Sequence, residues 1–235
     1  MDFFSTNVLI SLLTLTFLEI VLGIDNIVFV SLVASRMPVA NQKQVRILGL
    51  ILALVGRLVL LLGIGWVIGL NKSVFHINDF SVSFRDLILI VGGLFLVGKS
   101  TSEIHHKIEP KTKQAVNVKA LTVKGAIIQI ILLDLVFSLD SIITAVGLVD
   151  EMGVIIAAIS IAMVIMLAFS RRISEFINQH PAMKLLALSF LLMIGTVLIV
   201  EGFHVHVPKG YIYFSMAFAL GIEIINMKIR NNVSE

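Results

Sequence analysis

Residues 19–26 read Glu-Ile-Val-Leu-Gly-Ile-Asp-Asn and lie inside an apolar stretch that covers about residues 7–34. An α-helix needs roughly 20 mostly apolar residues to cross a bilayer, and this stretch is long enough. Ionisable side chains are rare within such helices, and those that occur commonly bind ions or substrates. Glu19 and Asp25 therefore indicate a binding site inside a membrane.

The composition extends this interpretation to the whole chain. Of its 235 residues, 58% are hydrophobic and 14% are charged, and the mean hydropathy is +1.03. A soluble domain carries about 25% charged residues, so this chain lacks the polar surface of one. The absence of cysteine excludes disulfides, Cys-ligated zinc and thiol catalysis. No basic stripe or nucleic-acid-binding motif is present, and we expect no nucleic-acid partner.

Seven stretches of the chain are candidate membrane spans. We expect an all-α, polytopic membrane protein in which residues 1–235 form a single transmembrane domain within the lipid bilayer. The spans are expected at about residues 7–34, 45–70, 86–102, 121–149, 154–170, 184–203 and 211–227.

The basic residues predict the orientation of these spans. Fourteen of the 18 Lys and Arg residues fall on one side of the predicted topology and three on the other, while Arg57 lies within the second span. Lys and Arg concentrate in cytoplasmic loops. The bias predicts that the N-terminus lies outside and the C-terminus in the cytoplasm.

A second acidic stretch repeats the first, since residues 134–141 read Asp-Leu-Val-Phe-Ser-Leu-Asp-Ser. A shift of 115 positions superposes the acids, small residues and an arginine, namely Glu19 on Asp134, Asp25 on Asp140, Gly23 on Ser138, Asn26 on Ser141 and Arg57 on Arg172. This shift covers three spans, so the two copies cross the membrane in opposite directions, as in many secondary transporters. We predict a 3+3 inverted repeat, with one repeat at about 7–102, the other at about 121–203 and an extra helix at about 211–227.

Helical geometry predicts a break in both acidic helices. Residues six positions apart, such as Glu19 and Asp25, lie about 120° apart around a regular helix. Both acids of a helix face one cavity only if that helix unwinds between them. We therefore expect breaks at Gly23 and Ser138, which would also free backbone carbonyls to bind a cation.

The polar side chains of the two stretches predict a metal site. Its ligands are expected to be Glu19, Asp25, Asn26, Asp134, Asp140 and Ser141. Carboxylate, amide and hydroxyl oxygens suit Mn²⁺, Ca²⁺ and Mg²⁺, whereas zinc and copper prefer His and Cys. Four uncompensated acids would cost on the order of 10–14 kcal/mol inside a bilayer. Arg57 and Arg172 are candidate ion-pair or gating partners, but they are fewer than the acids, which leaves room for a cation from solution.

Other residues carry weaker signals. Glu201, His204 and His206 at the outer end of the sixth span form a candidate metal-docking point, although histidine at an interface is more often solvated. Glu223 in the seventh span is expected to snorkel to the interface or to pair with Lys228, and a gating role is the alternative. The Gly92-Gly93 pair indicates close helix packing in the third span. The seventh span has no counterpart in the repeat and is a candidate packing or homodimer surface.

The two acidic motifs and residues 201–214, Glu-Gly-Phe-His-Val-His-Val-Pro-Lys-Gly-Tyr-Ile-Tyr-Phe, resemble the TerC family of integral membrane proteins over essentially the whole chain. Within that family the chain resembles the short, YgdQ-like members, which lack cytoplasmic regulatory domains. The resemblance implies a multi-pass protein of the bacterial inner (plasma) membrane, in the LysE-type transporter superfamily. It also implies a role in metal-ion homeostasis, notably manganese efflux, with the acidic motifs as the metal site.

The leading hypothesis is that this protein exports a divalent cation, Mn²⁺ or Ca²⁺, by alternating access, with protons as one simple coupling ion. We expect no enzyme activity and no prosthetic group. A first alternative is a non-transporting membrane scaffold or metal-homeostasis accessory protein, which uses its acids only for internal ion pairs. A second alternative is an exporter of an organic solute such as an amino acid, whose carboxylate Arg57 would bind.

Overall fold

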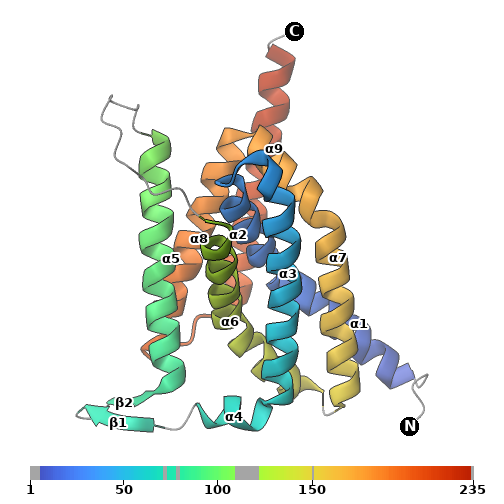
Figure 1. The fold of residues 1–235 in the computed structure, drawn as a ribbon, viewed down its shortest axis with the longest axis vertical. Coiled ribbons are helices and arrows are strands. Elements are labelled where there is room, and N and C mark those ends of the chain that lie inside the picture. The colour runs from blue at the N-terminus through green and yellow to red at the C-terminus, as the bar shows by residue number, and fades with distance from the viewer. Residues whose placement is uncertain (1–5, 71–72, 78–79, 109–121, 150, 234–235) are drawn as a thin grey trace. The chain divides into compact units, whose positions relative to one another are not determined.

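The computed structural model describes residues 6–70, 73–77, 80–108, 122–149 and 151–233, and nearly all of them are helical (Figure 1). In chain order the elements are α1 (Thr6–Leu22), α2 (Ile24–Ser35), α3 (Val39–Leu62), α4 (Ile64–Gly69), β1 (Ser73–Ile77), β2 (Phe80–Ser83), α5 (Phe84–Ile108), α6 (Val123–Leu148), α7 (Met152–Gln179), α8 (Pro181–Gly202) and α9 (Lys209–Val233).

Seven segments of the described chain are long and apolar enough to cross a membrane, as predicted. They are Val8–Ser35, Val39–Leu62, Phe84–Ile108, Val123–Leu148, Met152–Gln179, Pro181–Gly202 and Lys209–Arg230. Large apolar side chains on these helices remain uncovered by protein; Leu13, Phe17 and Leu62, for example, are 69%, 69% and 74% exposed. Such a surface fits lipid as the surrounding solvent.

The helix boundaries differ from the predicted ones where polar residues continue a helix. The second span begins at Val39 instead of residue 45, and the third extends to Ile108 instead of residue 102. The second span also ends early, because the chain turns at Gly63 into the short helix α4, which runs across the end of α3 (Figure 1). The antiparallel hairpin β1–β2 follows and is the one strand pair in the described residues. Hydropathy sets the apolar centre of a span, not its polar ends.

The chain divides into two compact units. The first comprises Met1–Phe84 and Lys119–Glu175, and the second comprises Arg85–Val118 and Phe176–Glu235. In the first unit α3 packs along both α6 and α2. Gly49 on α3 lies against Ile130 on α6, where an added Cβ atom would lie 2.8 Å from the Ile130 Cδ1 atom. The two acidic helical segments, α1–α2 and α6, run in opposite directions within this unit (Figure 1), as an inverted repeat requires; the repeat itself stays a prediction.

In the second unit α5 and α8 approach each other at glycines. A Cβ atom added to Gly93 would lie 2.7 Å from the Ile199 Cγ1 atom and 3.0 Å from the Ile199 backbone nitrogen. Gly195 lies against the Gly93 carbonyl oxygen and Leu96 in the same way. The close packing predicted from Gly92-Gly93 is therefore observed, because only a residue without a side chain lets the two backbones approach this closely.

The first acidic segment is broken at Gly23, as predicted, and the second is not. Gly23 separates α1 from α2, and its amide donates a 3.2 Å hydrogen bond to the Ile20 carbonyl oxygen. Helix α6 runs without interruption through Ser138, so the predicted break there is wrong. The Ser138 hydroxyl donates a 2.6 Å hydrogen bond to the Asp134 carbonyl oxygen. Serine can satisfy its hydroxyl within the helix in this way and therefore does not force the helix to unwind.

Gly23→Ala is expected to lower the free energy of unfolding by about 1–3 kcal/mol, the usual effect of overpacking. The added Cβ atom would lie 2.6 Å from the Met166 Sδ atom and 2.8 Å from the Glu19 carbonyl oxygen. Thermal denaturation of the purified protein in detergent measures the effect. Gly147→Ala is the matched control, because a Cβ atom there meets nothing within 4 Å. Equal melting temperatures for the two variants would show that Gly23 is not sterically required.

Candidate functional site

Three charged side chains meet in the interior of the first unit, one each from α1, α3 and α6. Arg57 Nη1 donates a 3.0 Å hydrogen bond to Glu19 Oε2, and Arg57 Nη2 donates a 2.7 Å bond to Asp134 Oδ1. Arg57 Nε adds a 3.1 Å bond to Asp134 Oδ2. Only 1% of Glu19, 3% of Arg57 and 5% of Asp134 is exposed. We call these three residues the charged cluster.

Each member of the charged cluster has its position set by its helix. Glu19 lies one turn before the break at Gly23, and Arg57 lies in the C-terminal half of an otherwise apolar stretch of α3. Asp134 lies near the middle of α6 and accepts a further 3.1 Å bond from the Ser138 hydroxyl. Because α3 packs along α6, the long arginine side chain spans the distance to both acids. The cluster therefore ties three helices together.

The charged cluster carries more negative than positive charge. When both acids are ionised, two carboxylates face one guanidinium, which leaves one negative charge in excess. Among the described residues, Glu19 Oε1 and the amide nitrogen of Asn26 are buried and have no hydrogen-bond partner. Asn26 is 5% exposed and lies just beyond the helix break, on α2. An excess charge and an unpaired oxygen are features that a bound cation would satisfy.

The structure does not bring all six predicted metal ligands together. Within the described part of the chain, no three or more acidic or histidine side chains are grouped so that they could hold a metal ion. The side chain of Asp25 lies outside the described residues. Asp140 is partly buried, and the unbroken α6 holds it about 120° around the helix from Asp134. Ser141 is buried and donates its hydroxyl to the Ser138 carbonyl oxygen at 3.3 Å.

The predicted ion-pair and gating residues differ in their surroundings. Arg172, the repeat partner of Arg57, is exposed, so the two arginines do not play equivalent roles. Glu223 accepts a 2.8 Å bond from Arg230, seven residues further along α9, and not from Lys228 as predicted. Arg230 reaches back along the helix because its longer side chain presents several donors in a planar fork.

His204, which the sequence indicated only as part of a candidate metal-docking point, has a partner that was not predicted. His204 Nε2 lies 2.9 Å from Asp86 Oδ2, and Asp86 is 2% exposed at the start of α5. His204 has a positive φ of 63°, which non-glycine residues rarely adopt. Glu201 is 8% exposed and His206 is exposed, and neither forms a metal cluster with His204 within the described chain. In the predicted topology the third span begins on the outer side of the membrane, and the sixth span ends on the same side. This shared location was the signal in the sequence that could have paired Asp86 with His204.

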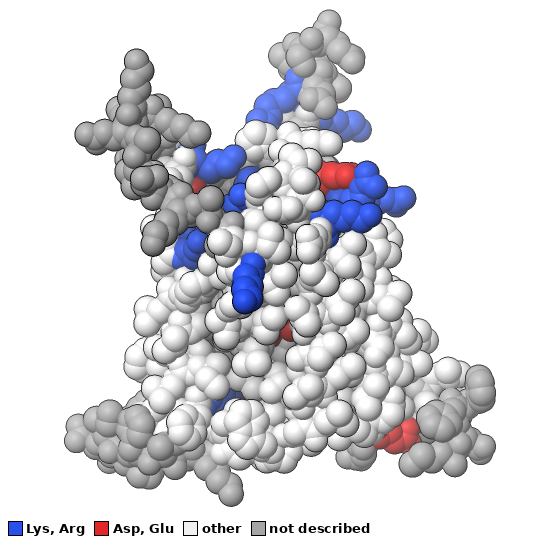
Figure 2. Space-filling view, in the orientation of Figure 1, with Lys and Arg blue, Asp and Glu red and all other residues white. Residues whose placement is uncertain are grey.

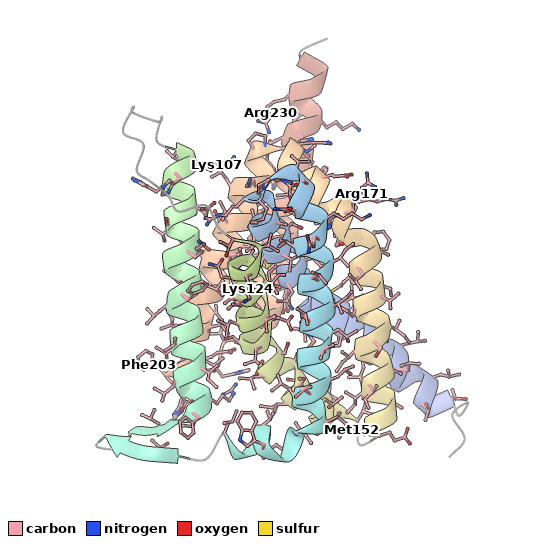
Figure 3. The ribbon with its side chains drawn as sticks, viewed as in Figure 1. Lys107, Lys124, Met152, Arg171, Phe203 and Arg230 are labelled. Atoms are coloured by element: carbon pink, nitrogen blue, oxygen red, sulfur yellow. The ribbon has the colours of Figure 1, made fainter. Side chains whose placement is uncertain are left out.

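The described residues therefore form a multi-pass helical membrane protein that encloses a buried charged cluster near a helix break. Figure 3 shows the spans with their side chains, with Met152 at the beginning of α7 and Arg171 in its last third. The chain belongs to the TerC family of integral membrane proteins, whose family model matches residues 4–235.

Curated relatives agree with this assignment. The chain is 50% identical to the inner membrane protein YgdQ of Escherichia coli over 225 residues, which cover 96% of this chain and 94% of the relative. A related protein of Haemophilus influenzae is 45% identical and covers 94% of both chains. The inner membrane protein YoaE of Escherichia coli is 47% identical, but the match covers only 43% of that longer protein. No solved structure matches this chain. The protein is accordingly a multi-pass protein of the bacterial inner membrane.

Proposed function

We propose that this protein is a secondary transporter that exports a divalent cation, Mn²⁺ in the first place, and that Glu19 and Asp134 bind the cation. The observation that carries the proposal is the charged cluster, in which two buried acids from different helices share one guanidinium. Inside a bilayer such acids are costly and are commonly found along ion pathways. The TerC membership supports a transport role, and the family's association with manganese efflux favours this cargo and direction.

Arg57 holds the cation-free state in this proposal. Its guanidinium bonds to Glu19 Oε2 and to both oxygens of Asp134, which are the atoms that a cation needs. A cation that enters the cluster therefore competes with Arg57 for the same oxygens. Hard carboxylate ligands favour Mn²⁺, Ca²⁺ or Mg²⁺ over softer metals. Protons that return on the same carboxylates would complete the cycle.

The helix break gives the cluster a means to change shape. Gly23 joins α1 to α2 only four residues after Glu19, and Asn26 follows on the far side of the break. A change of backbone torsion at Gly23 would move Glu19 relative to Asn26 without disturbing the continuous α6. Interrupted helices also form the midplane binding sites of other secondary transporters. Of the remaining predicted ligands, Asp25 and Ser141 belong to the proposal as further ligands, whereas Asp140 would join the site only if α6 rotated about its axis during the cycle.

Cation flux into proteoliposomes tests the proposal. Purified protein should carry Mn²⁺ across the membrane, and Glu19→Gln or Asp134→Asn should reduce the initial rate by about tenfold or more, since each loses an ionic ligand worth over about 1.4 kcal/mol. Glu151→Gln is the matched control, because Glu151 is exposed in the loop after α6 and its variant should transport normally. Absence of Mn²⁺ or Ca²⁺ flux in the wild-type protein would refute the proposal.

A second candidate function, a non-transporting scaffold, is favoured by one observation. Arg57 pairs with both acids, which is what a purely structural ion cluster would require. The same observation weighs against export of an amino acid, because the guanidinium that would bind its carboxylate already binds two. Competition of an amino acid with Mn²⁺ in the flux assay checks the latter function directly.

A further inference from the structure

A second arginine of α3, Arg46, is buried and has no ion-pair partner among the residues that the structure describes. It is 8% exposed, and its Nε atom is buried with no hydrogen-bond partner in the described part of the chain. Arginine does not lose its charge in proteins. A buried charge is costly unless an opposite charge and hydrogen bonds compensate it. Arg46 thus differs from Arg57, whose guanidinium is fully engaged with two acids.

The charged groups near Arg46 do not neutralise it. Glu175 attracts it and Arg171 repels it, both from the last turns of α7. The Glu175 carboxylate is already bonded to Arg171 at 2.7 Å, and both of these side chains are at least half exposed. Taken together, Arg46, Arg171 and Glu175 leave one positive charge in excess. In Figure 2 several basic side chains lie beside an acidic one near the top of the view.

Arg46 lies near the beginning of α3 and directly precedes the apolar stretch that starts at Ile47. Arg46 is the eighth residue of α3, about 10 Å from its first residue at 1.5 Å per residue. Arginine side chains near helix ends extend toward the membrane interface. The planar fork of the guanidinium pairs well with phosphate oxygens.

From these observations we propose that Arg46 forms a binding site for a phosphate group, which the headgroup of an anionic phospholipid fills in the membrane. The bonded pair Arg171–Glu175 borders this site and contributes no net charge to it. The site is distinct from the charged cluster and does not depend on the proposed transport function. The bound phosphate would hold the beginning of α3 against the end of α7.

Lipid-dependent thermal stability tests this proposal with the full chain. The wild-type protein is placed in nanodiscs of phosphatidylcholine alone and of phosphatidylcholine mixed with phosphatidylglycerol. We expect phosphatidylglycerol to raise the melting temperature, since a ligand that binds only the folded state stabilises it. Arg46→Gln should lose this increase, and Arg46→Lys should keep part of it. The matched control is Arg172→Gln, which removes an equal charge from an exposed position and should keep the increase.

A second arm separates the two sources of phosphate. Inorganic phosphate is added to the protein in nanodiscs of phosphatidylcholine alone. If phosphate raises the melting temperature through Arg46 and phosphatidylglycerol does not, the phosphate site is supported. The same result would overturn the lipid headgroup as the occupant of the site. An equal phosphatidylglycerol effect in Arg46→Gln and Arg172→Gln would overturn the site, because general surface charge would explain it. No response of the wild-type protein to either probe would also overturn it.

Discussion

Replacement of Arg57 by glutamine is expected to lower the free energy of unfolding by about 3–5 kcal/mol, the usual cost of removing one partner from a buried ion pair. The variant leaves Glu19 and Asp134 buried side by side without a counter-charge, although each is at most 5% exposed. Thermal denaturation in detergent measures the change. It is one of the two largest effects that the structure predicts, because Arg57 bonds to two buried acids at once.

The control for this variant is Arg172→Gln, which changes the exposed arginine that the predicted repeat aligns with Arg57. Its melting temperature should match that of the wild-type protein, since surface substitutions commonly change stability by less than about 0.5 kcal/mol. Added Mn²⁺ should restore part of the stability of Arg57→Gln, because the cation would replace the missing guanidinium. If Arg57→Gln were as stable as the control, the charged cluster would not contribute the predicted 3–5 kcal/mol, about the cost of breaking a buried ion pair, to the free energy of unfolding.

The second large effect concerns the triple variant Glu19→Leu, Arg57→Met, Asp134→Leu. Replacement of a whole buried ion cluster by apolar residues of similar volume is often neutral or stabilising by about 1–4 kcal/mol. We expect this variant to fold at least as stably as the wild-type protein, while Mn²⁺ flux is lost. The Ser138 hydroxyl keeps its bond to the backbone carbonyl of residue 134, so α6 is undisturbed. Melting temperature and proteoliposome flux are measured on the same preparation.

This variant separates the two candidate functions more sharply than single substitutions do. A single acid-to-amide change confuses loss of fold with loss of function, because it leaves Arg57 without one of its partners. A stable triple variant without flux supports transport through the cluster. The opposite result is a stable triple variant that supports growth of a deletion strain and transports Mn²⁺ as well as the wild-type protein. It would show that the acids serve only as a structural ion cluster.

The sequence predicted the seven spans because each has an apolar centre of membrane length, a property that depends on local composition alone. It also predicted the break at Gly23, because acids six residues apart can face one cavity only if the helix unwinds between them, and glycine is a poor helix former. The same geometric argument failed at Ser138, whose hydroxyl bonds within the helix. Periodicity located the acids but did not reveal that Arg57 pairs with Glu19 and Asp134 together, because this pairing depends on how three helices pack.

Contacts between distant segments explain what else the sequence left open. Asp86 was not singled out, because its role depends on His204, which lies 118 residues away. Arg46 was counted only as a loop-side basic residue, since its burial arises from packing around α3. Glu223 was assigned to a nearer lysine, although Arg230 reaches it from two turns away. Local pattern identifies candidate residues, and tertiary packing decides their partners.

The excess negative charge of the cluster makes proposed export sensitive to the membrane potential. One elementary charge that crosses the membrane exchanges about 2.3 kcal/mol with a potential of 100 mV. Two carboxylates and one guanidinium carry a charge of −1, and a bound divalent cation changes it to +1. If the cluster returns without a cation or protons, each cycle therefore moves two net positive charges outward, against an inside-negative potential. If the cluster returns with one proton on each carboxylate, the cycle moves no net charge. Because the cluster has two carboxylates, it can carry the two protons that make export of one divalent cation independent of the membrane potential.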